Sequence, residues 1–296
     1  MKKDDYLQGD VAKFCIWLSQ RLRGESINFS THGHDQAYAT LRDALNVYAW
    51  PSKRTAGIEN GDGDGDGDEE FPYLYPSVPT LLAWSNLQEN QNVLDVIQQA
   101  LRDSFWNDTA HTQKLAGAVA ATLHWGGVYT RTRHGGNKPW LADNHGSLFA
   151  ILQEVVNDHA NGEDFSQVPS LRFNAGMTKV YSLLLDNFII YDSRVAASLA
   201  WLALRWWTLS ERRPRNELPE NLRFLCLPGK GKATGQRNPD PTLFSTSATK
   251  PYKHYQWNIR ANWLLQHAQS LAGECSGFKS LREIEAALFQ MGDRVA

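Results

Sequence analysis

The chain has 296 residues, which is enough for one large domain or for two modest domains that share a core. Its hydrophobic fraction of 42% and its mean hydropathy of -0.46 are typical of a soluble globular protein. The formal net charge is -2, which excludes a global field that would direct the protein to nucleic acid, so any basic surface must be local.

The start of the chain, MKKDDYLQGD, has two lysines but no apolar stretch, so we do not expect a signal peptide. The most apolar run, VAASLAWLAL, stops at Arg205 and is too short to span a bilayer. Cys15, Cys226 and Cys275 are odd in number and far apart, which indicates free thiols in a reducing compartment. We therefore expect a cytoplasmic protein without a membrane partner.

Helical periodicity dominates the chain and predicts a mostly all-α fold. The first segment, 10–24, places Val11, Phe14, Leu18 and Leu22 on one face, and Gly24 suits its end. The remaining predicted helices are 35–50, 92–106, 113–125, 147–160, 177–186, 194–207, 258–272 and 280–292. Alternation typical of a strand is scarce, and FIIY at 188–191 is the main candidate.

We predict three parts along the chain: an N-terminal helical part at 1–60, an acidic flexible loop at 61–72 and a helical core at 73–296. The acidic loop begins like a calcium loop with Asp62, Asp64 and Asp66, but Tyr73 stands where a bidentate Glu is needed. THGHD at 31–35 lacks a convincing third metal ligand, so Thr31 or Asp35 as a helix cap is the simpler interpretation. LPGKGKATG does not match a phosphate-binding loop, and we expect neither a metal nor a cofactor.

The segment 229–256 has little periodicity and is predicted to be a long loop. From Gly229 to Arg260 six cations and one acid, Asp240, give a net charge of +5, and four aromatic rings lie among them. Such a pattern favours phosphate contacts combined with base stacking over an ordinary solvated loop. The predicted DNA contacts here are Lys230, Lys232, Arg237, Lys250, Lys253 and Arg260.

The stretch FNAGMTKVYSLLLDNFIIYDSRVAASLAW, 173–201, places Asp192 between an apolar run and an apolar helix. As a helix cap, Asp192 would accept the N–H groups of the first turn. This interpretation leaves unexplained the tight turn NAGMTK before another helix, with Lys179 on its first turn.

The same stretch resembles the helix-hairpin-helix DNA glycosylases, in which a glycine hairpin opens a helix and an aspartate opens the next one. NAGMTK is similar to the hairpin and FIIYDSRV to the aspartate segment. The resemblance implies a fold of two helical subdomains with a cleft between them, with the hairpin inside 170–208. It implies that Asp192 is the catalytic aspartate and that Lys179 takes the place of the lysine nucleophile of bifunctional members. It also implies DNA contacts from Asn174, Gly176, Thr178 and Arg194.

The resemblance implies removal of a damaged or modified base from duplex DNA by a monomer that flips the base out of the stack. Because Lys179 and Asp192 are only thirteen residues apart, we favour a monofunctional enzyme over a bifunctional lyase. Trp125, Trp140 and Phe289 are guesses for the walls of a base pocket. The acidic insert and the atypical hairpin suggest a role against foreign DNA that carries modified bases. The alternative hypotheses are a non-catalytic nucleic-acid-binding protein, in which Asp192 is only a cap, and an interaction protein with an acidic partner.

Overall fold

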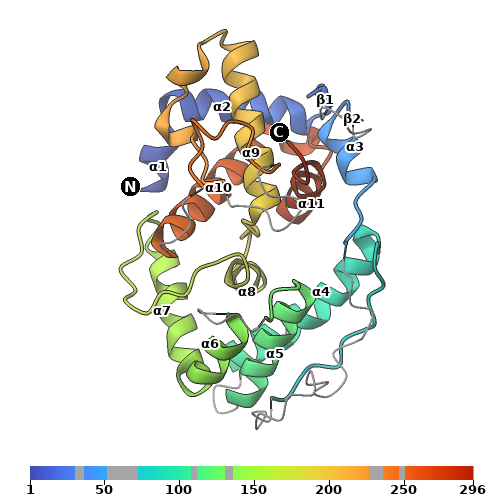
Figure 1. Cartoon of the computed structure of the whole chain (residues 1–296), viewed down its shortest axis with the longest axis vertical. Coiled ribbons are helices and arrows are strands. Elements are labelled where there is room, and N and C mark those ends of the chain that lie inside the picture. Colours follow the sequence, from blue (N-terminus) through green and yellow to red (C-terminus); the bar gives the residue numbers. More distant parts are fainter. Residues whose placement is uncertain are drawn as a thin grey trace. The chain divides into compact units, whose positions relative to one another are not determined.

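The computed structural model describes residues 1–30, 37–51, 73–107, 112–130, 136–226, 236–246 and 251–295. Within these ranges the chain is mostly helical, which confirms the all-α expectation at this level (Figure 1). Strands in the described ranges are limited to one antiparallel pair, β1 (Phe29–Ser30) and β2 (Ala37–Tyr38). The acidic loop at 61–72 and the THGHD motif lie outside the described residues.

The chain divides into two compact units. The first unit is Met1–Tyr48, Asn161–Gln167 and Ile189–Ala296, and the second is Ala49–Ala160 and Val168–Phe188. These boundaries differ from the three predicted parts, because the N-terminal helices share a unit with the C-terminal ones. A burial pattern along the sequence shows which face of a helix is covered but not which distant helix covers it.

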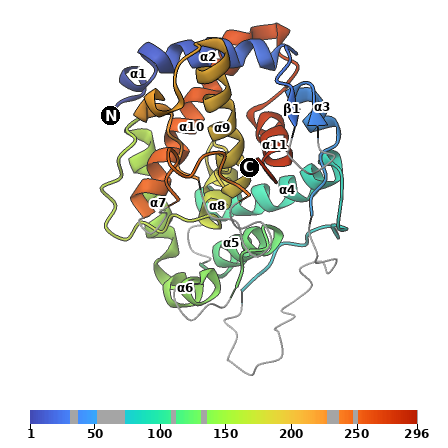
Figure 2. The same cartoon turned by 45° about the horizontal axis from the view of Figure 1, so that its top comes forward.

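The first unit contains α1 (Lys3–Tyr6), α2 (Gly9–Leu22), α3 (Leu41–Asn46), α9 (Ser193–Arg205), α10 (Pro251–Ala272) and α11 (Leu281–Met291). In its core α2 packs on α10, and α11 packs on both α3 and α9. The predicted apolar face of α2 is buried, with Phe14, Leu18 and Leu22 fully covered. In Figures 1 and 2 α2 lies along the C-terminal end of α9, where Phe14 meets Trp206 at 5.4 Å between ring centroids.

The second unit contains α4 (Leu87–Arg102), α5 (Thr112–Trp125), α6 (Asn137–Asn144), α7 (Leu148–Ala160) and α8 (Met177–Leu184). Helix α5 is its centre, and almost all of its side chains from Leu115 to Trp125 are buried. It is rich in Ala and Gly because neighbours approach closely: a Cβ on Gly117 would collide with the backbone of Leu74. Trp125 at its end stacks on Trp50, with ring centroids 4.6 Å apart and planes 5° apart.

Local hydrogen bonds explain where helix starts differ from the predictions. The helix predicted at 35–50 begins only at Leu41, because Thr40 and Asp43 form a capping box, and Tyr38 belongs to β2 instead. A second capping box, between Asn86 and Glu89, starts α4 earlier than predicted. Helix α10 begins at Pro251, so the end of the predicted 229–256 loop is helical, which suits proline at a first helical position.

Two short helical segments follow predicted helices. Segment η1 (Asp103–Asn107) continues α4, and η3 (Trp206–Ser210) continues α9, both in the wider π-helical form. The other single turns within the described ranges are η2 (His145–Ser147), η4 (Arg215–Glu217), η5 (Glu220–Leu222) and η7 (Gly273–Cys275). The stretch 188–191, the candidate strand, is extended but forms no ladder with a described strand.

Candidate functional site

The backbone that leads into Asp192 is held by side chains of α10 and α11 within the first unit. Asn262 Oδ1 accepts the N–H of Ile189 at 2.7 Å, and Asn258 Nδ2 donates to the carbonyl of Ile189 at 3.1 Å. Glu285 Oε2 accepts the N–H of Ile190 at 2.7 Å. These bonds replace a sheet partner, and we call the residues that make them, together with His254, the polar brace.

His254 completes the polar brace one residue before the aspartate. Its Nε2 lies 2.7 Å from the carbonyl oxygen of Tyr191, and since a carbonyl only accepts, Nε2 carries the proton. All four brace side chains are buried, so each satisfies a backbone group that water does not reach. The result is a fixed extended backbone directly before Asp192.

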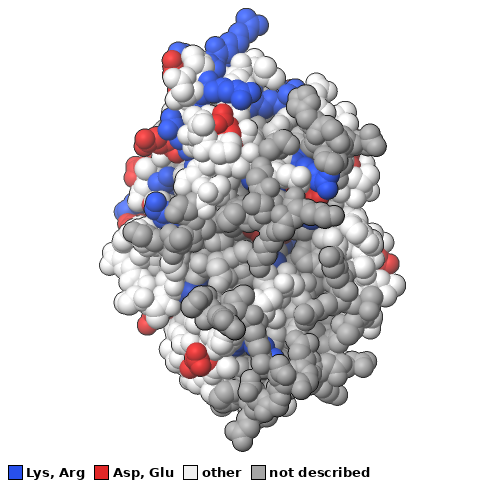
Figure 3. All heavy atoms as spheres, in the orientation of Figure 1, with Lys and Arg blue, Asp and Glu red and all other residues white. Residues whose placement is uncertain are grey.

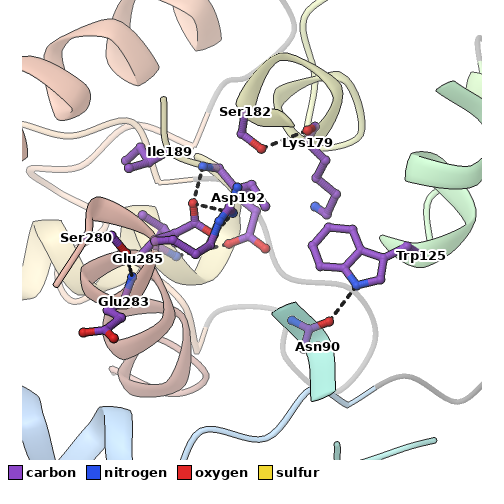
Figure 4. A network of polar contacts seen from close by, with 12 residues as sticks. Asn90, Trp125, Lys179, Ser182, Ile189, Asp192, Ser280, Glu283 and Glu285 are labelled. Carbon is purple, nitrogen blue, oxygen red and sulfur yellow. Dashed lines mark hydrogen bonds and ion pairs between the residues drawn. The ribbon is translucent and has the colours of Figure 1, made fainter. Parts of the chain in front are cut away.

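Asp192 is the N-cap of α9, as the simple interpretation of the sequence predicts. Its Oδ1 accepts the N–H groups of Arg194 at 2.9 Å and Val195 at 3.1 Å. No described residue donates to Oδ2, and the side chain is half-buried. One carboxylate oxygen therefore caps the helix while the other stays available (Figure 4).

Glu285 lies close enough to Asp192 for their charges to interact. Burial raises the pKa of Glu285 above its ordinary value of 4.5, while Arg282 and the Ile190 N–H oppose the shift and Asp192 adds to it. Arg282 Nη1 donates to both carboxylate oxygens of Glu285, the longer contact being 2.9 Å. Glu285 is thus bonded to the backbone N–H of Ile190 and to Arg282, whereas Asp192 is the more accessible acid (Figure 4).

Two predicted DNA-contact arginines lie beside the first turn of α9 and share one acid. Arg194 Nη2 is 2.7 Å and Arg237 Nη2 is 2.9 Å from Asp293 Oδ1. Arg237 also donates to the hydroxyl of Ser193 at 2.8 Å, and Arg194 lies over the ring of Phe289 at 4.4 Å. Burial lowers the pKa of Arg194, and Asp293 opposes that shift. Two cations with one shared acid leave a local surplus of positive charge next to Asp192.

The predicted hairpin belongs to the second unit and uses its own side chain to hold the turn. Asn174 Oδ1 accepts the N–H groups of Gly176 at 2.8 Å and Met177 at 2.9 Å, which opens α8. Gly176 has no positive φ, and the reason for glycine there is that a Cβ would collide with Asn137. Thr178 and Gly176 are buried, so the expected contact of these two with DNA is corrected: they are interior, and the turn's N–H groups are bonded to Asn174.

Lys179 is buried, with 3% of its surface exposed. Its Nζ donates to the carbonyl of Ala175 at 2.8 Å, and its methylenes lie against Gly126, where a Cβ would collide with them. In Figure 4 its side chain points toward Trp125, whose Nε1 donates to Asn90 at 2.8 Å. Lys179 is thus an interior side chain of the second unit and not a solvated one.

The three aromatic guesses each have a neighbour within their own unit. One face of Trp125 is covered by Trp50, and Trp140 is half-buried with Arg172 over its ring at 5.5 Å. Phe289 is buried under Arg194 and lies 6.1 Å from the ring of Tyr48. Trp125 and Phe289 are therefore core residues rather than open walls, and Trp140 is the most accessible of the three.

Of the other basic residues predicted to contact DNA, the two described ones lie on helix α10. Lys253 is exposed on the first turn of α10, whereas Arg260 lies farther along the same helix and forms an ion pair with the buried Asp164. Lys230, Lys232 and Lys250 lie outside the described residues. Arg260 lies in the predicted helix, and its guanidinium faces an internal acid instead of the expected DNA phosphate.

The sequence contains a signal for the polar brace that periodicity alone does not reveal. His254, Asn258 and Asn262 are spaced four apart, so they form one polar stripe on a face of α10 that is otherwise apolar. Buried polar side chains need partners, and a stripe of them indicates an irregular backbone on the facing side. Only the fold shows that this backbone is the segment before Asp192.

In the described residues no group of three or more His, Cys, Asp or Glu side chains is arranged to hold a metal ion. The helices of the described chain include none that is both long and apolar enough to cross a membrane. No family model, curated protein or solved structure matches this chain.

Proposed function

We propose that the protein is a DNA glycosylase that removes a damaged or modified base, with Asp192 as its catalytic carboxylate. The observation that carries the proposal is that the two carboxylate oxygens of Asp192 differ: Oδ1 caps α9, and Oδ2 has no donor among the described residues. A residue that only caps a helix does not require the backbone before it to be held by four buried side chains. Such bracing suits a carboxylate that must keep its position during a reaction.

In the proposed reaction the bond between C1′ of the sugar and the base nitrogen breaks, and the base leaves with the electron pair. Positive charge then develops on the sugar, and a carboxylate held nearby stabilises it. Water adds its oxygen to C1′ and gives one proton to Asp192. The departing base takes up one proton, which returns Asp192 to its carboxylate form. The α9 dipole and the two N–H donors interact favourably with a negative charge on Asp192.

Asp192→Asn tests this proposal. Asparagine caps a helix about as well as aspartate, so the free energy of unfolding should change by less than about 0.5 kcal/mol. Base release from DNAs with assorted lesions, detected as alkali-labile abasic sites, should fall to background. Asp240→Asn is the matched control, because Asp240 also accepts a backbone N–H, from Thr242 at 3.0 Å in the same unit. Full base release by Asp192→Asn would overturn the role of Asp192. No base release by the wild type would support the non-catalytic binding protein instead.

The proposed enzyme is monofunctional, and the position of Lys179 is consistent with that choice. Its Nζ donates to the carbonyl of Ala175 and its stem is packed, so attack on a sugar would require the side chain to leave its site. Borohydride should therefore trap no covalent protein–DNA adduct, and Lys179→Met should still produce abasic DNA. An adduct formed by the wild type and lost in Lys179→Met would show that the enzyme is a bifunctional lyase.

A further inference from the structure

Two arginines of the first unit lie on tryptophan rings at the end where α2 meets α9. The Cζ of Arg21 is 4.2 Å from the ring centroid of Trp17 on α2, and that of Arg205 is 5.2 Å from Trp201 on α9. Figure 3 shows Lys and Arg side chains gathered over α2 and the segment that follows α9, at the top of the view. Trp206, the residue after Arg205, packs against Phe14 of α2 at 5.4 Å between ring centroids, so both arginines lie at the junction of the two helices. Burial lowers the pKa of Arg21, and the charge of Arg205 lowers it further.

This end of the unit has more hydrogen-bond donors than acceptors. Arg205 makes no hydrogen bond or ion pair with a described residue, although it is half-buried. Arg21 has one acid partner, the exposed Glu25 at 3.1 Å, and its Nη1 also donates to Gln20 at 2.9 Å. Arg21 Nε and Trp17 Nε1 are buried and have no hydrogen-bond partner in the described chain. Buried donors rarely stay unsatisfied in native proteins, so the surplus favours an anionic ligand.

We propose that Arg21 and Arg205, each placed on a tryptophan ring, bind a phosphate group together. A phosphate offers several acceptor oxygens to two planar guanidinium groups, and each ring keeps its arginine in place by a cation–π contact. Arg212 and Arg213 follow helix α9 a few residues later: both are exposed and make no ion pair with a described residue. The segment that carries them is fixed, because Trp207 Nε1 donates to the carbonyl of Pro214 at 2.9 Å.

The phosphate site is separate from Asp192, because the two lie at opposite ends of α9. That helix has 13 residues, so its ends are about 20 Å apart at the usual helical rise. The site therefore takes phosphate independently of the excision proposed at Asp192. The phosphate can belong to a nucleic-acid backbone or to a free phosphate-bearing molecule, and the experiment distinguishes these sources.

Arg205→Met tests the site, because methionine keeps much of the aliphatic contact with Trp201 and removes the charge. Arg42→Met is the matched control: Arg42 also lies over a ring, that of Phe278, but has an acid partner in Glu283. Inorganic phosphate, compared with chloride at equal ionic strength, should raise the melting temperature of the wild type and of Arg42→Met but not of Arg205→Met. Arg205→Lys keeps the charge but lacks the planar guanidinium group, so phosphate should raise its melting temperature by less than that of the wild type.

Duplex DNA identifies the source of the phosphate. If the site takes a backbone phosphate, Arg205→Met should reduce the slope of log binding constant against log salt by about 0.9. An unchanged slope together with stabilisation by inorganic phosphate would assign the site to a free phosphate-bearing molecule. The proposal would be overturned if phosphate did not stabilise the wild type and Arg205→Met did not change the slope. It would also be overturned if Arg42→Met changed the response to phosphate and the slope as much as Arg205→Met does. Absence of base release would count against the proposed role of Asp192 and would not bear on the phosphate site.

Discussion

At the scale of single residues, Asp192 shows that capping and chemistry do not exclude each other. A helix N-cap uses one oxygen, so a carboxylate caps with Oδ1 and leaves Oδ2 for another role, whereas a hydroxyl cap has no second oxygen. Elsewhere in the same unit hydroxyl side chains serve as helix caps, at Thr40 and Ser280. The choice of aspartate at 192 therefore agrees with a role beyond the cap.

Glu285 gives the stability of the protein a specific pH dependence. Because burial raises its pKa above 4.5, the folded state holds this proton to a higher pH than the unfolded chain. Its contribution to the free energy of unfolding is therefore largest at low pH and falls as the pH rises through the folded-state pKa. As the pH rises from about 4.5 through the folded-state pKa, the wild type should lose stability relative to Glu285→Gln. Urea unfolding of both proteins across that range measures the difference, and a constant difference would contradict the assignment.

At the scale of elements, side chains of α10 and α11 in the polar brace form the hydrogen bonds to the backbone before Asp192 that a neighbouring strand would form in a sheet. An extended segment in a helical protein has backbone groups that no neighbouring strand satisfies, and these groups are costly when buried. Asn258 and Asn262 act as a pair, since Asn262 Nδ2 also donates to the carbonyl of Asn258 at 2.8 Å. One helix face thus fixes the entry to the next helix.

Asn262→Ala tests the brace. The substitution leaves the buried N–H of Ile189 without its acceptor, so the free energy of unfolding should fall by about 1–3 kcal/mol. Base release should decrease as well, because the backbone before Asp192 is no longer fixed. Gln269→Ala on the same helix is the control, since Gln269 makes no hydrogen bond with a described residue. A loss no larger than that of the control would show that the brace is not needed.

At the scale of the whole molecule, the first unit is assembled from three separate stretches of the chain. Its C-terminal stretch buries surface against α2 and β1: Cys15 of α2 donates to the carbonyl of Leu264, and the ring of Phe29 of β1 lies 4.9 Å from Trp201. A fragment of residues 189–296 alone should therefore show no cooperative unfolding transition, because its core lacks α2 and α3. Adding a peptide of residues 1–48 should restore one, as followed by near-UV circular dichroism. A cooperative transition of the single fragment would contradict this dependence.

The sequence by itself determined the helical class and most helix positions. Local rules act over four residues, so apolar spacing identified α2, α5, α7, α9 and α11 within a few residues. It also placed Asp192 at the start of a helix, after an extended segment and a turn that opens another helix. The missed boundaries are local too: the capping boxes at Thr40 and Asn86 are readable in the sequence but were outweighed by the apolar pattern.

Only the tertiary structure decided which side chains are accessible and which distant residues meet. Lys179 and Thr178 are polar in sequence but buried in the second unit, and Arg260 faces Asp164, almost a hundred positions away along the chain. The polar brace also joins residues far apart in the sequence. Spacing along a chain determines the face of a helix, whereas burial and charge pairing depend on what packs against that face.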